Sequence, residues 1–110
     1  MNVYDTANNL ASEIQKSDEY LKFKVAKEKI KSNPELKEKI DEFEKIRYDV
    51  QILGLQGKKV EEEKNKKLQE MYTILTQNKE IKEYFDLEVQ FNVMIADVNK
   101  IIAEAVKDVL

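Results

Sequence analysis

The scarcity of chain-breaking residues constrains the fold of this chain most. The sequence contains two glycines, Gly54 and Gly57, and one proline, Pro34. A β-sandwich needs many turns, which glycine and proline commonly supply, whereas a set of long helices needs few. Good helix formers such as Lys, Glu, Leu, Ile and Gln are common. The sequence therefore predicts an all-α fold, and 110 residues are enough for a single helical domain spanning 1–110.

Apolar spacing and capping residues predict a multi-helix bundle of about five helices. The first helix covers about 3–15, where one apolar stripe follows a three/four spacing: Val3, Ala7, Leu10 and Ile14. Ser17 is expected to cap a second helix that ends near Ser32. Asn33 and Pro34 fit the cap and first position of a third helix.

The second half of the chain begins with a strongly charged segment. Gly57 is expected to end the third helix, and Lys58–Glu70 predicts an exposed hairpin tip that leads into a fourth helix. Asn78 is expected to cap a fifth helix that continues to about Val109.

This fifth helix is unusually long and apolar. Its residues 79–109 would span about 46 Å, which exceeds the diameter of roughly 35 Å of a compact domain of this length. One apolar arc of about 120° contains most of the large side chains: Tyr84, Leu87, Phe91, Met94, Ile95, Val98, Ile101, Ile102, Ala105 and Val109. A second, narrower strip contains Phe85, Val89, Ala96 and Ala103. The chain's own helices can cover one arc. The second strip therefore needs another surface to cover it, which predicts a partner.

We therefore expect self-association, most simply as a two-fold homodimer or else as a higher oligomer. The interface candidates all lie on the fifth helix: Phe85, Val89, Phe91, Met94, Ile95, Val98, Ile101, Ile102 and Ala105. The alternative is that these same side chains form an intrachain core. The sequence does not separate the two roles for any single residue.

The composition argues against catalysis. Cys, His and Trp are absent, which excludes a disulfide, a Cys/His zinc site, a thiolate nucleophile and an imidazole base. Two glycines cannot build a phosphate-binding loop, and the many carboxylates alternate with lysines as on a solvated face. We expect no catalytic residue, metal or cofactor. An enzyme with an unusual carboxylate or Ser–Lys site is the alternative, and it would need a concave pocket of convergent polar groups.

The charge balance gives no general attraction to nucleic acid. Lys and Arg total 19 and Asp and Glu total 22, which makes the net charge −3. A strip of Lys24, Lys27 and Lys31 on the second helix could contact RNA, but Glu28 interrupts it. A nucleic-acid-binding module is therefore a disfavoured alternative. Val89–Ala96, an uncharged run of eight residues in the second half, is far shorter than the roughly 20 residues of a membrane span, and no signal peptide is evident. A cytoplasmic protein without membrane contact is expected.

Three stretches carry a family resemblance over nearly the whole chain. They are Val3–Ala11, Ser32–Leu36 with the long helix after it, and Phe91–Ile102. In their order and spacing they resemble the YlbF/YmcA family of small helical bacterial proteins, and within it the YheA-like branch.

The resemblance implies an all-α bundle that self-associates. It also implies a regulator with a protein partner, linked to competence, biofilm formation, sporulation and control of an mRNA-processing endoribonuclease. Some family members bind an iron–sulfur cluster through Cys, but this chain has no Cys, so that cofactor does not carry over. The partner implied beyond the chain itself is an unidentified protein.

Overall fold

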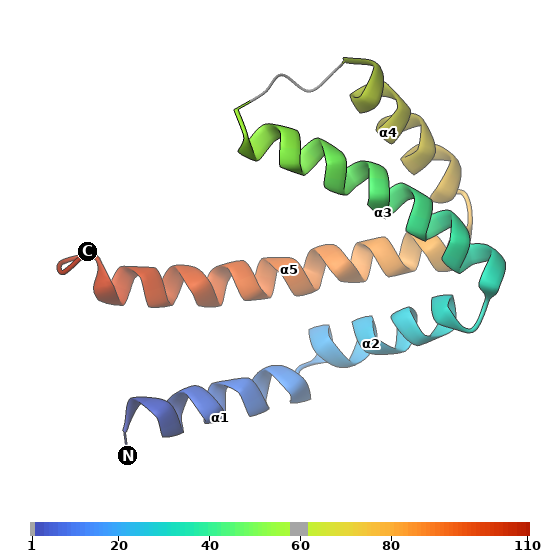
Figure 1. Cartoon of the computed structure of the whole chain (residues 1–110). Helices are drawn as coiled ribbons and strands as arrows, with labels where there is room; N and C mark the ends of the chain where they lie inside the picture. Colours follow the sequence, from blue (N-terminus) through green and yellow to red (C-terminus); the bar gives the residue numbers. More distant parts are fainter. Residues whose placement is uncertain (1, 58–61) are drawn as a thin grey trace. The chain divides into compact units, whose positions relative to one another are not determined.

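The computed structural model describes residues 2–57 and 62–110, and this part of the chain consists of α-helices joined by short turns (Figure 1). The helices are α1 (Val3–Lys16), α2 (Asp18–Lys31), α3 (Pro34–Leu55), α4 (Glu62–Leu75) and α5 (Lys79–Val106). This confirms the predicted all-α fold with five helices and a long C-terminal helix. The predicted tip at Lys58–Glu70 lies partly outside the described residues.

Side-chain caps set where the helices begin. The predicted caps Ser17, Asn33 and Asn78 each accept a hydrogen bond from the backbone N–H three residues ahead, at 3.2, 3.2 and 3.1 Å. Asn2 does the same for α1 at 2.9 Å. Such bonds satisfy donors that have no partner inside the helix. Pro34 occupies the first position of α3, where its missing N–H costs nothing.

The ends of the two longest helices show how the backbone leaves the helical path. After α3 ends at Leu55, Gly57 takes a positive φ of 69°, which confirms its predicted role as a stop. α5 ends at Val106, three residues before the predicted Val109. The Val109 N–H bonds to the Val106 carbonyl at 3.1 Å, so the final turn is not regular α-helix.

The chain divides into two compact units, residues 28–83 and residues 1–27 together with 84–110. In the first of these, α3 packs closely against α4. The Phe43 ring lies 6.2 Å from the Tyr72 ring, and the Arg47 guanidinium lies 5.6 Å from the centre of the Phe43 ring. The buried side chains of these two helices are Leu36, Ile40, Phe43 and Leu75.

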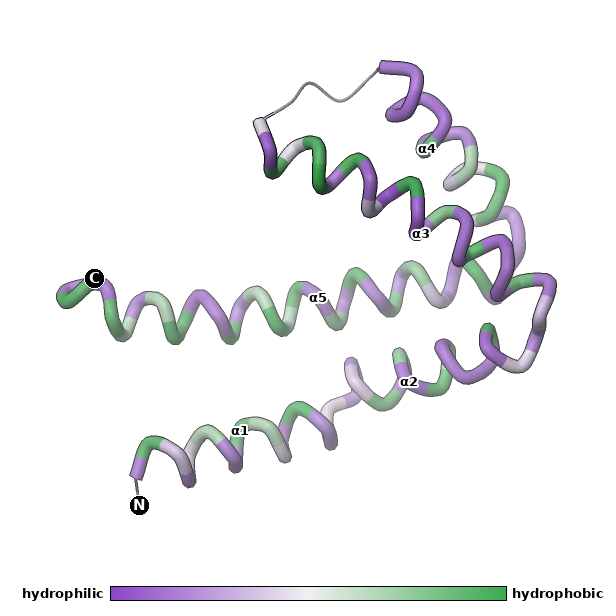
Figure 2. Tube along the Cα trace, viewed as in Figure 1, coloured by the Kyte–Doolittle hydropathy of each residue, from purple (hydrophilic) through white to green (hydrophobic). Residues whose placement is uncertain are grey.

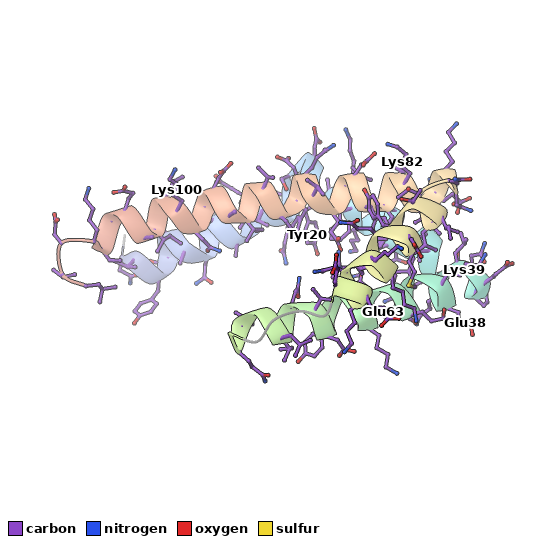
Figure 3. All side chains as sticks on the ribbon, turned by 90° about the horizontal axis from the view of Figure 1, so that it is seen from above. Tyr20, Glu38, Lys39, Glu63, Lys82 and Lys100 are labelled. Carbon is purple, nitrogen blue, oxygen red and sulfur yellow. The ribbon has the colours of Figure 1, made fainter. Side chains whose placement is uncertain are left out.

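In the other unit, α2 and α5 meet through aromatic rings, and α1 runs alongside the C-terminal half of α5 in the opposite direction (Figures 1 and 3). This unit contains the predicted interface residues.

Candidate interaction surface

The burial of α5 is greatest near its start and least near its end. Near the start, Ile81 is 1% exposed and Phe85 is 3% exposed. Beyond Leu87 no α5 side chain is buried, and Ile101 and Ile102 are 69% and 52% exposed. Hydrophobic residues nevertheless recur along α5 to its C-terminal end (Figure 2). The uncovered apolar surface therefore lies in the C-terminal half of α5.

This distribution differs from the predicted division into a covered arc and an uncovered strip. Phe85, assigned to the uncovered strip, is buried within the chain itself. Ile101 and Ile102, assigned to the covered arc, are exposed. The reason is that the segments beside α5 cover its early residues more fully than its late ones, so burial depends on position along the axis as well as on the face.

The nine interface candidates accordingly fall into three groups. Phe85 is buried. Four candidates are half-buried: Phe91, Met94, Ile95 and Val98. The remaining four are exposed in the single chain: Val89, Ile101, Ile102 and Ala105. The exposed group offers the most surface to a partner.

An aromatic cluster explains why Phe91 is half-buried. Its ring lies 6.2 Å from the Tyr20 ring and 5.5 Å from the Phe23 ring, and both of those residues belong to α2. Phe23 also stacks on Tyr84, with ring centroids 5.6 Å apart. Aromatic pairs at these separations add to the apolar burial that joins two helices. Phe91 thus already serves intrachain packing, the alternative role that the sequence left open.

A further helix contributes to the exposed apolar surface, although the sequence predicts no interface residue on it. α1 contains no buried residue, although its apolar residues form one stripe. Val3 and Tyr4 are 81% and 80% exposed, and Leu10 and Ile14 are half-buried. The stripe itself was visible in the sequence. That the rest of the chain fully buries no residue of this stripe was not.

A shallow groove lies between α2 and α5 in the same unit. Its volume is about 370 Å³, and it is lined by Asp18, Glu19, Lys22, Val89, Gln90 and Val93. Val89 and Val93 are 60% and 54% exposed. Apolar side chains next to charged ones are the chemistry of a contact surface.

The predicted basic strip is present on α2. Lys24, Lys27 and Lys31 are all exposed, and so is Glu28 among them. The Lys27 ammonium lies 5.6 Å from the centre of the Phe23 ring, within the range of a cation–π contact. The strip is accessible, but it is interleaved with an opposite charge.

Other kinds of site find little support in the described part of the chain. Over residues 2–57 and 62–110, Asp and Glu side chains do not gather in groups of three or more that could hold a metal ion. None of the described helices combines the length and apolar character needed to cross a bilayer. On the surface, charged side chains such as Glu38, Lys39 and Lys100 are exposed (Figure 3).

Comparisons with known proteins place the chain among its relatives. A "UPF0342 protein" of Caldicellulosiruptor bescii is 38% identical over 106 residues, which cover 96% of this chain and 89% of the relative. A "UPF0342 protein" of Caldicellulosiruptor saccharolyticus is 40% identical over 105 residues, covering 96% and 88%. A solved structure titled "Protein of Unknown Function (DUF964) from Bacillus stearothermophilus" has the same fold, with a TM-score of 0.83 at 18% identity over 96% of this chain and 93% of that one.

The family model that matches the chain covers residues 3–107 and is described as "Control of competence regulator ComK, YlbF/YmcA". This match spans every described helix, from Val3 in α1 to Val106 in α5. The chain therefore belongs to the YlbF/YmcA family, whose description links it to control of a competence regulator.

Proposed function

We propose that this protein is a non-catalytic adaptor or regulator that works in the cytoplasm through protein–protein contacts, as a member of the YheA-like branch. The observation that carries the proposal is the uncovered apolar surface of α5, where Ile101 and Ile102 are 69% and 52% exposed. Large apolar side chains left exposed in this way mark protein interfaces. The regulatory description of the family supports the same conclusion.

The composition of the chain supports a role in binding. A protein without Cys and His has few ways to activate a nucleophile or to hold a catalytic metal. By family resemblance, the pathways affected are competence, biofilm formation or RNA processing. The partners proposed are a second copy of the chain and a further regulatory protein.

A complementation experiment tests this function. The chain is expressed in a naturally competent bacterium that lacks its own family member, and transcription from a ComK-dependent promoter is measured. We expect the wild-type chain to restore transcription and Ile101→Glu to fail, because a charge on this surface opposes apolar contact. Ile74→Glu on α4 is the matched control, since Ile74 is 70% exposed. No restoration by a well-expressed wild-type chain contradicts the proposed regulatory role.

The exposure of Lys24, Lys27 and Lys31 supports a second candidate, a nucleic-acid-binding module. Phosphate contacts would make its affinity fall steeply with salt. Reversing all three charges should then abolish a salt-dependent shift of RNA mobility. If the wild-type chain does not bind RNA at low salt, this candidate is removed.

A further inference from the structure

The groove between α2 and α5 has an apolar α5 side. Val89 and Val93 both line the groove, and they are 60% and 54% exposed, although valine is among the residues most often buried. They are four residues apart on α5, so they lie on one face of the helix about 6 Å apart along its axis. α5 therefore presents two adjacent apolar side chains to a molecule that enters the groove.

The α2 side of the groove is acidic. Asp18 and Glu19 line it from the first turn of α2, and Lys22 lines it one turn later. Asp18 is exposed and Glu19 is half-buried. Among the described residues, neither of these carboxylates takes part in an ion pair. Both carboxylates are therefore open to a cation supplied from outside the chain.

A further acidic residue borders the groove on α5. Asp97 is exposed and lies four residues after Val93, on the same side of the helix. Asp18, Glu19 and Asp97 thus place three negative charges around the valines, against the single positive charge of Lys22. An apolar centre with an acidic border is complementary to a segment that is apolar in its middle and cationic at its edges.

The form of the groove favours a helix as the bound segment. The groove lies between two helices, and side chains spaced i,i+4 on a third helix can pack between the side chains of its neighbours. Two apolar residues with that spacing would contact Val89 and Val93, and Lys or Arg beside them would reach the carboxylates of Asp18 and Glu19. Laying an amphipathic helix into a groove is a recurrent mode of recognition between proteins.

The exposed apolar segments at the two ends of this chain lack the required charge. α1 and residues 91–106 each carry two acidic side chains and one basic one: Asp5, Glu13 and Lys16 in the first, Asp97, Lys100 and Glu104 in the second. Their net charge of −1 opposes docking against an acidic border. α2 differs, because it has five lysines and the exposed Leu21 and Val25 at i,i+4. The experiment below therefore includes α2 as a competing occupant.

We propose that the groove between α2 and α5 binds a cationic amphipathic helix of a partner protein. Val89 and Val93 supply the apolar contacts, and Asp18 and Glu19 supply the charged ones. This inference rests on the proposed role in protein–protein contacts and names the chemistry of the partner. The groove residues on α2 belong to neither α1 nor the C-terminal half of α5, so partner binding and self-association can be measured separately.

A titration of the full chain with synthetic peptides tests the proposal. The probe is a helical peptide with leucines at i,i+4 and lysines beside them. One reference peptide has the same residues in scrambled order, and another has glutamates in place of the lysines. The NMR amide signals of the isotope-labelled chain locate the binding, and fluorescence anisotropy gives the affinity. We expect the probe to shift the signals of residues 18–22 and 89–93 and to bind at least about tenfold more tightly than either reference.

A pair of matched variants tests the charged contacts. Asp18→Asn combined with Glu19→Gln should weaken binding of the probe by about tenfold at low salt and by less at high salt, because salt screens exposed charges. Glu62→Gln combined with Glu63→Gln is the control, since these residues form the corresponding acidic pair in the first turn of α4. The control variant should bind the probe as the wild-type chain does.

A second pair tests the apolar contacts. Val93→Ser should weaken binding by about tenfold, because it removes apolar area from the centre of the groove. Val25→Ser is the control, since Val25 is 56% exposed, close to the 54% of Val93, and does not line the groove. Equal losses for the groove variants and their controls would overturn the proposal.

The remaining outcomes are equally decisive. The proposal is overturned if the probe does not bind at millimolar concentration, or if the shifted signals lie outside the groove. It is also overturned if a peptide with the sequence of residues 18–31 binds the groove as tightly as the probe, because a second copy would then be the occupant. The complementation experiment does not depend on these titrations, so it decides the regulatory role separately.

Discussion

The Phe23 ring on α2 stacks on the Tyr84 ring on α5, with centroids 5.6 Å apart and planes inclined by 14°. Phe23 also contacts Phe91 two turns further along α5, at 5.5 Å. One α2 side chain thus contacts α5 at two positions along its axis, and these two contacts fix the direction of α2 relative to α5. Beyond Phe91 the α5 side chains are at most half-buried, and the exposed apolar ones among them become the candidate interaction surface.

Truncation of Phe23 should destabilise the chain. Phe23→Ala removes both ring contacts from a half-buried position, and we expect a loss of about 2 kcal/mol in the free energy of unfolding. Tyr48→Ala is the control, because Tyr48 is 62% exposed and should change stability by less than about 0.5 kcal/mol. Urea denaturation measures both. Equal midpoints for the two variants would show that the aromatic cluster contributes little to stability.

The two glycines should respond to alanine with opposite signs. Gly54 lies within α3 and an added Cβ would meet nothing within 4 Å, so Gly54→Ala should stabilise by up to about 1 kcal/mol. Gly57 has a φ of 69°, so Gly57→Ala should destabilise by about 1 kcal/mol despite equally open surroundings. Thermal denaturation of both variants measures the signs. Two shifts in the same direction would contradict the assigned backbone conformations.

The Asn33 cap should contribute measurably to the free energy of unfolding. Asn33→Ala removes the acceptor of the Leu36 N–H, and we expect a loss of about 1 kcal/mol. Asn65→Ala in the first turn of α4 is the control, since alanine is the better helix former and no loss is expected. Chemical denaturation compares the two variants. A loss at Asn65 as large as that at Asn33 would argue against a capping effect.

Local features of this fold follow from the sequence because they depend on neighbouring residues alone. Ser17, Asn33 and Asn78 cap helices because a short polar side chain can reach the N–H three residues ahead wherever the backbone enters a helix. Gly57 adopts a conformation that other residues rarely take. These positions need no knowledge of tertiary packing.

The extent of packing along α5 could not be predicted in the same way. Periodicity identifies which side chains share a face, but it does not say how far other helices reach along that face. Phe85 and Ile101 show the difference, since one is 3% exposed and the other 69%. The exposure of α1 could not be predicted for the same reason. Its apolar stripe has the spacing that is also found on helices buried in a core.

Sedimentation equilibrium of the wild-type chain over a range of concentrations tests the central claim most directly. We expect the apparent mass to rise with concentration to twice the 12.9 kDa of one chain, and Ile101→Glu to shift this rise to higher concentration while Ile74→Glu does not. A mass that stays at that of one chain throughout would contradict the claim that the exposed apolar surface of α5 meets a second copy.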